Sequence, residues 1–337
     1  MAERIAPVRR VLGSWDVIVL LAVVAVATVG AFTIEGVASP RFWRFVVLEA
    51  LPIALIALPM TLVVITGEID LSVASVLGLT CTVMGQLWVS GVTSLPLLIA
   101  LCLLLGAVLG AVNGLFVTGF GLPSLAVTIG TLALYRGLAY VVLGDRAVAN
   151  YPREWTSSAI APIPGTTIPW MILVLAALAV VFAVVLHATP VGRALYAMGN
   201  NAEAARFAGV NVRLTKFWLF VATGAMSALA GVFWTLRFAS ARADNGSGLE
   251  LAVVAAVLLG GVSIFGGRGA LLGVLAAVAL LGVLRNALQL AYVPANTLTV
   301  ITGALLIASV VGPNVAGMLR ERLRRRRSTA PTATPTT

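Results

Sequence analysis

Hydrogen-bonding side chains interrupt several otherwise apolar stretches of the sequence. A site for a small polar molecule combines a few hydroxyl, amide and aromatic groups with mostly apolar surroundings. We therefore predict a solute path lined by Asp70, Asn113, Thr128, Thr131, Tyr135 and Trp234. The alternative is that these side chains hydrogen-bond neighbouring helices, or anchor a helix at the membrane surface, without touching solute.

Charged residues also occur inside or beside apolar stretches, as Glu49, Glu68, Asp70, Arg136 and Glu250. A charge in the membrane interior costs about 2.5 kcal/mol or more, so it usually faces a cavity or a partner. The position of Asp70 fits an acid at a helix N-terminus, where the helix dipole stabilises it. For Glu68 and Asp70 the alternative to a path role is solvation combined with helix capping. Arg136 is expected to pair with an acid or to extend toward the interface.

The sequence contains no pattern that indicates an enzyme. His187 is the single histidine and stands at the end of an apolar stretch. Cys81 and Cys102 lie within apolar stretches, which favours small buried side chains over a disulfide or metal pair. The only lysine, Lys216, follows a threonine and is not part of a G-x-x-x-x-G-K-[ST] phosphate loop. We therefore expect no catalytic residue, no metal and no cofactor in this chain, and no ATP hydrolysis by it alone.

A short helix is predicted over residues 202–208, between two long apolar stretches. Asn200 and Asn201 can cap its N-terminus, and Glu203 lies in its first turn, where the helix dipole favours an acid. Gly209 stands where a left-handed residue would end the helix. From the spacing alone, this segment is either an ordinary surface helix or a docking element for another protein.

The composition indicates which surroundings these residues must have. Of 337 residues, 60% are hydrophobic and only 10% are charged, whereas a soluble domain has about 25% charged residues. Most of the surface must therefore face lipid. The net charge of +10 would suggest nucleic acid in a soluble protein, but six of the 22 basic residues fall in the run 320–327, directly after an apolar stretch. That position indicates anionic lipid and the positive-inside rule instead of nucleic acid.

The apolar stretches predict an all-α, polytopic membrane protein with about ten transmembrane helices, because spanning a bilayer takes roughly 20 apolar residues. They fall at 15–33, 44–66, 71–90, 94–118, 123–143, 168–188, 216–236, 250–265, 270–291 and 295–313. The eighth stretch is short and ends in GGVSIFGGRG, which indicates a broken or re-entrant helix as readily as a full span.

The basic residues predict the orientation. With ten spans and the N-terminus inside, fourteen basic residues lie on the cytoplasmic side and six outside. The division is then a cytoplasmic segment 1–14, a transmembrane domain 15–315 and a cytoplasmic tail 316–337, basic first and then disordered because of its Thr/Pro/Ala composition. Within the domain, loop 144–167 is expected outside and loop 188–215 inside. We expect a bacterial plasma membrane protein with both termini cytoplasmic.

Several segments resemble the permease subunits of ATP-binding-cassette importers. EAARFAG, residues 203–209, matches the EAA-x-x-x-G pattern of these permeases, although the later Ile-x-Leu-Pro part of that pattern is absent. GEIDLSVAS, NGLFVTGFGLPSLAVTIGTLALYRG, GRALYAMGNNAEAARFAGVNV and LLGGVSIFGGRGALLG are similar, in the same order, to ribose-type sugar permeases, a family that overlaps the branched-chain amino-acid permeases. GVLRNALQLAYVPA is most similar to the rhamnose and autoinducer-2 members.

This resemblance implies a function and a set of partners. The chain would form the translocation path for a sugar or sugar-like solute, with ATP and Mg bound by a separate ATPase subunit. The coupling residues would be Asn201, Glu203, Ala204, Ala205, Arg206 and Gly209. The other implied partners are a second permease subunit, identical or paralogous, an extracytoplasmic solute-binding protein and the lipid membrane.

Two other functions remain open from the sequence. An ion-coupled secondary transporter of a small polar solute could use Glu68, Asp70 or Glu250 to carry a proton or sodium ion. A membrane scaffold without transport activity is the third alternative, which the coupling-type helix disfavours.

Overall fold

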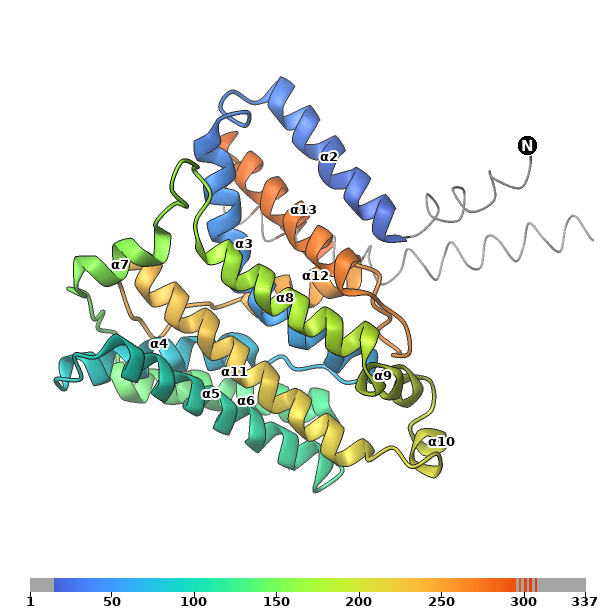
Figure 1. Ribbon diagram of the computed structural model, residues 1–337. Helices are drawn as coiled ribbons and strands as arrows, with labels where there is room; N and C mark the ends of the chain where they lie inside the picture. Colours follow the sequence, from blue (N-terminus) through green and yellow to red (C-terminus); the bar gives the residue numbers. More distant parts are fainter. Residues whose placement is uncertain (1–14, 295–296, 298–299, 302, 305–306, 308–337) are drawn as a thin grey trace, which may run out of the picture.

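The computed structural model describes residues 15–294, 297, 300–301, 303–304 and 307, and the elements of this part are helical. Isolated bridges, such as Val148 with Ala241, are the only β pairing there. The helices in chain order are α2 Trp15–Thr33, α3 Pro40–Ile65, α4 Val73–Val89, α5 Leu95–Thr118, α6 Ser124–Leu143, α7 Arg153–Ile160, α8 Met171–Ala188, α9 Pro190–Asn200, α10 Ala202–Phe207, α11 Val212–Phe238, α12 Leu249–Leu259 and α13 Leu271–Leu290 (Figure 1).

Helix α3 forms the centre of the bundle. Ser39 caps it by accepting a hydrogen bond from the Phe42 N–H at 3.2 Å, and Pro40 follows in the first turn. Every residue from Leu51 to Ile65 is buried, because α8, α11, α12 and α13 all pack against α3. A helix that is apolar on all sides and surrounded by other helices is expected in the core of a large membrane bundle.

Glycines bring α5 and α11 into close contact. A Cβ on Gly110 would lie 2.2 Å from the Phe220 carbonyl oxygen, and one on Gly224 would lie 2.1 Å from the Gly106 carbonyl oxygen. These distances leave no room for any side chain. Small residues that let helix backbones approach closely are the usual basis of packing in membranes, where no hydrophobic force drives helices together.

The predicted spans agree with the helices over the described part of the chain. Seven helices are long and apolar enough to cross a membrane, namely α2, α3, α5, α6, α8, α11 and α13. The third predicted stretch forms the shorter α4, and most of the tenth, 295–313, lies outside the described residues together with segments 1–14 and 316–337. Large apolar side chains are exposed on α2, α5, α6 and α8, for example Leu104 and Val180, as expected for surfaces that face lipid or another subunit.

The eighth predicted stretch is a broken span. Helix α12 has 11 residues, about 16 Å at 1.5 Å per residue, which is half of a bilayer core. It ends at Leu259, and residues 260–270 are not helical. Positive φ values at Gly261, Gly266 and Gly267 turn the chain there, a conformation that glycine adopts without steric cost.

Candidate functional site

The helix predicted at 202–208 is present as α10, Ala202–Phe207. The Asn201 Oδ1 accepts a hydrogen bond from the Ala204 N–H at 3.0 Å, so Asn201 is the cap, while the Asn200 amide donates to the Tyr196 carbonyl oxygen within α9. Gly209 has a φ of +88°, the left-handed value expected of a residue that ends a helix. Ala205 is buried, and the other coupling candidates, Asn201, Glu203, Ala204, Arg206 and Gly209, are exposed.

Helix α9 supports α10 and ties it to the core. A Cβ on Gly199 would lie 1.9 Å from the Ile65 carbonyl oxygen, so α9 sits directly on the end of α3. The Gly267 N–H donates to the same Ile65 oxygen at 2.8 Å, and the Tyr196 hydroxyl donates to the Gly269 carbonyl oxygen at 2.7 Å. Force applied to α10 would therefore be transmitted to α3 and to the turn after α12. The sequence analysis did not predict α9, because this helix is short and amphipathic, with Gly192, Leu195 and Met198 buried, and does not form an apolar run.

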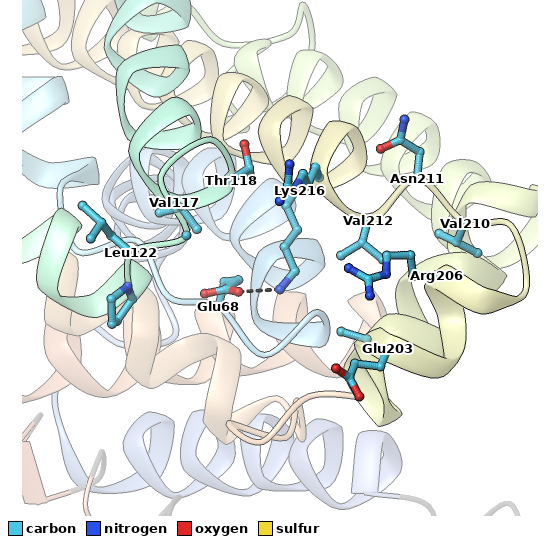
Figure 2. A pocket seen from close by; sticks show the side chains of 14 residues that line it. Glu68, Val117, Thr118, Leu122, Glu203, Arg206, Val210, Asn211, Val212 and Lys216 are labelled. Carbon is cyan, nitrogen blue, oxygen red and sulfur yellow. Dashed lines mark hydrogen bonds and ion pairs between the residues drawn. The ribbon is translucent and has the colours of Figure 1, made fainter.

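A cavity of about 830 Å³ lies beside α10. It is lined by α10, by the turn between α5 and α6 that includes Gly121, and by the start of α11. Figure 2 shows Glu203 and Arg206 on one side of it and Glu68 on the other. The Lys216 Nζ and the Glu68 Oε1 form an ion pair at 2.5 Å in its wall. Glu68 therefore has a fixed partner, Lys216, which sequence reasoning did not connect with it.

Three of the predicted path residues, Asp70, Asn113 and Tyr135, are linked through Ser72 by a chain of hydrogen bonds inside the subunit. The Asp70 Oδ1 accepts from the Ser72 N–H at 2.9 Å and from the Ser72 hydroxyl at 2.6 Å. The Asn113 amide donates to the Ser72 Oγ at 2.8 Å, and the Tyr135 hydroxyl lies 3.3 Å from the Asn113 Oδ1 and 3.0 Å from the Leu109 carbonyl oxygen. Thr128 joins the same segment by donating to the Ile69 carbonyl oxygen at 3.3 Å.

These residues are buried within one subunit, and they do not line the cavity beside α10. Asp70 is 1% exposed and Asn113 is fully buried. Thr131 is also buried and donates within α6 to the Thr128 carbonyl oxygen. The structure thus places them as links between α4, α5 and α6, which is the helix-to-helix alternative. Asp70 is buried and therefore not solvated, and its carboxylate accepts from Ser72, the residue before α4, so it lies beside the start of this helix without capping a first-turn N–H.

Trp234 does not join this group. It lies on α11, half-buried, with its ring 5.1 Å from the ring of Phe238 and its surface against the main core. In the part of the chain that the structure describes, none of the six side chains predicted to line a solute path lines the cavity beside α10.

Two of the remaining intramembrane charges, Glu49 and Arg136, have partners within the described residues. The Arg237 Nη2 pairs with the Glu49 Oε1 at 2.5 Å, and its Nη1 donates to the Leu48 carbonyl oxygen. Arg136 donates to three main-chain carbonyl oxygens, those of Ala74, Ala243 and Asn245. The acid partner expected for Arg136 is therefore replaced by carbonyl groups of non-helical chain and of the start of α4. No group of three His, Cys, Asp or Glu side chains that could hold a metal occurs in the part of the chain that the structure describes.

Two functional candidates were not found from the sequence. Phe207, the last residue of α10, is 84% exposed. In a sequence this rich in apolar residues, one phenylalanine does not stand out as a candidate for a protein contact. The segment 240–248, rich in Gly, Ser and Asn, has the composition of an ordinary external loop, yet Arg136 binds it within the bundle.

Comparison with known proteins identifies the family. The family model described as "Branched-chain amino acid transport system / permease component" matches residues 42–310. The chain belongs to this permease family. Autoinducer 2 import system permease protein LsrD of Escherichia coli O157:H7 is 37% identical over 270 residues, which cover 78% of this chain and 81% of that protein. The proteins of the same name from Escherichia coli strain K12 and from Shigella flexneri are 36% identical with the same coverage. No solved structure matches the chain.

Proposed function

We propose that this permease is the membrane-spanning subunit of an ATP-binding-cassette importer for a sugar or sugar-like solute, with ATP hydrolysed by a separate subunit. The observation that carries the proposal is α10, a capped helix that is exposed to solvent and seated through α9 on the central helix α3. Family membership supports the same function. The relatives named for autoinducer 2 import favour a solute of that kind.

The exposed face of α10 is the proposed contact with the ATPase. Ala204 is small and allows close approach, while Glu203 and Arg206 offer charges at the rim. Phe207 adds a large exposed apolar side chain of the kind that dominates binding energy at interfaces. Asn201 and Gly209 would act indirectly, by fixing where the helix begins and ends. ATP and Mg would be bound by the ATPase subunit.

The proposed assembly contains a second permease subunit, identical or paralogous, and an extracytoplasmic solute-binding protein. It would lie in a bacterial plasma membrane with both termini cytoplasmic, the α10 side inside and loop 144–167 outside. In this orientation the ends of α3, α5 and α8 would lie on the ATPase side, since Ile65 contacts α9, Thr118 lines the cavity beside α10, and α9 follows α8 directly.

The energy source tests the proposal. In vesicles containing the assembled transporter, dissipating the proton and sodium gradients while ATP is maintained should leave solute uptake unchanged. Removing ATP, or using a Phe207→Asp variant that still inserts, should abolish uptake, and the variant should also reduce recovery of the ATPase in a pull-down. Uptake that stops with the ion gradient and continues without ATP would favour a secondary transporter instead.

A further inference from the structure

The connection between α11 and α12 penetrates deeply into the bundle. Near its beginning, Ala241 pairs with Val148 and would contact a Cβ on Gly85, close to the end of α4. Five residues later, a Cβ on Gly246 would lie 2.7 Å from the Leu77 Cδ2 and 3.5 Å from the Ala74 carbonyl oxygen. Leu77 is 12 residues from the end of α4 at Val89, about 18 Å at 1.5 Å per residue. The segment therefore descends to about the middle of a bilayer core.

Arg136 fixes this descending segment. Its Nη1 donates to the Ala243 carbonyl oxygen at 2.6 Å and to the Asn245 carbonyl oxygen at 2.8 Å, while its Nη2 donates to the Ala74 carbonyl oxygen at 3.0 Å. One guanidinium thus connects α6, the start of α4 and the segment. A lysine could not make the same three contacts, because only a guanidinium has donors in a planar fork.

Part of the segment is exposed at this depth. Ser247 and Gly248 are exposed, and Glu250 in the first turn of α12 is half-exposed, whereas the exposed Asp244 lies nearer the end of α6, beside Gly144. Non-helical backbone at membrane depth is tolerated only where protein covers it or where it lines a water-filled cavity, because each unsatisfied peptide group costs several kcal/mol in lipid. This surface therefore cannot face lipid.

We propose that residues 244–250 line the solute path and that Arg136 is their positioning residue. The proposal rests on the transport function above and deepens it. Glu250 offers a carboxylate acceptor, and Ser247 and the open backbone around Gly248 offer further hydrogen bonds. Because Arg136 is occupied by carbonyl groups and Arg242 pairs with Asp244 at 2.9 Å, the surface has acceptors in excess. It suits an uncharged solute with several hydroxyl groups, and it disfavours an anion such as a phosphorylated sugar.

Thiol labelling tests the position of the segment. Cys81 and Cys102 are buried, so the background should be low. In membranes with the assembled transporter, a charged, membrane-impermeant methanethiosulfonate should modify Ser247→Cys and Glu250→Cys. The control is Val180→Cys on the exposed apolar face of α8. We expect modification of the first two at least about tenfold faster than the control, because only a hydrated cysteine forms the reactive thiolate. If Ser247→Cys fails to insert, the labelling rate of Glu250→Cys tests the accessibility of the same surface.

Rates equal to that of Val180→Cys would overturn the path assignment. If ATP-driven uptake were intact in the same vesicles, the transport function would stand and only this inference would fail. The role of Arg136 is tested in double variants that combine Ser247→Cys with Arg136→Lys or Arg136→Gln. The labelling rate of the cysteine is compared with that of Ser247→Cys alone. Both substitutions should change that rate several-fold while the labelling of Ser157→Cys in loop 144–167 stays constant. An unchanged rate in both would show that Arg136 does not position the segment.

Discussion

Glu68 and Lys216 are 148 positions apart and form an ion pair with 2.5 Å between the Oε1 and Nζ atoms. Glu68 lies in the connection between α3 and α4, and Lys216 lies in the second turn of α11. The side chains are 18% and 15% exposed. The pair therefore joins the connection after α3 to α11 in the wall of the cavity beside α10.

Breaking this pair should destabilise the permease. Lys216→Met leaves a mostly buried carboxylate without its partner, and hydrogen bonds to charged groups contribute about 1.5–3 kcal/mol. We expect a lower Tm for the purified protein, and a partial recovery in the double variant Glu68→Lys, Lys216→Glu. Arg242→Met, which breaks a half-exposed pair with Asp244, is the matched control and should change the Tm little. A double variant no more stable than the single one would contradict a direct interaction.

The buried hydrogen-bond chain makes a second prediction. Tyr135→Phe removes a hydroxyl that donates to the Leu109 carbonyl oxygen and lies beside the Asn113 amide oxygen. The expected loss of stability is about 0.5–1.5 kcal/mol. Tyr140→Phe, on the same helix but 43% exposed, should have no measurable effect. Solute affinity should be equal in both variants, and a selective loss of affinity in Tyr135→Phe would restore its role in the path.

The sequence predicts the spans well because long apolar runs in a membrane have one stable conformation. It also predicts α10, since Asn201 and Gly209 each have a local structural requirement. It does not predict which polar residues face a path. Asn113 and Tyr135 are buried because α4, α5 and α6 converge on them. The residue pattern of one helix does not show which other helices pack against it.

The sequence also does not predict that the segment 240–248 enters the bundle. Gly, Ser and Asn in a row are typical of a solvent-exposed turn, and the depth of this segment depends on Arg136, more than 100 positions earlier in the chain. Arg136 itself stands out in the sequence as an unusual intramembrane charge. Its three carbonyl partners belong to main chain, so no complementary residue type elsewhere in the sequence could indicate them.

The third prediction compares a glycine at a helix contact, Gly110, with a glycine that has open space beside it, Gly137. Gly110→Ala places a Cβ 2.2 Å from the Phe220 carbonyl oxygen and should force α5 away from α11, with a cost of about 1–3 kcal/mol or more. A Cβ on Gly137 would meet no described atom within 4 Å, so Gly137→Ala should be neutral or slightly stabilising, because alanine favours helix. Detergent-solubilised Tm values compare the two. Equal Tm values would mean that the two helices are not in close contact.

Topology provides a fourth prediction. Ser157→Cys in α7 should react with an impermeant thiol reagent in intact cells, because loop 144–167 is placed outside by the distribution of basic residues. Ala208→Cys, exposed after α10, should react only after the membrane is permeabilised. The reverse pattern would invert the proposed orientation and place α10 on the wrong side for an ATPase.

The last prediction concerns coupling through α10. Gly209 has a φ of +88°, and among the described residues no heavy atom lies within 4 Å of the position that a Cβ would occupy. A substitution there therefore acts through backbone strain and not through collision. Gly209→Val should shift the end of α10, because a β-branched residue resists positive φ. Glu203→Ala should do less, since an exposed charge at a helix end contributes about 0.3–1 kcal/mol.

Gly165→Val is the matched control for this strain. Gly165 has a φ of +78°, its Cβ position is equally open in the described part of the chain, and it lies in loop 144–167, on the proposed opposite side of the membrane. All three variants should insert normally. Pull-down of the ATPase and binding-protein-stimulated ATP hydrolysis in liposomes should fall sharply for Gly209→Val alone. If Gly209→Val and Gly165→Val behave alike in both assays, α10 is an ordinary surface helix, and the importer function then rests on family membership without a coupling site.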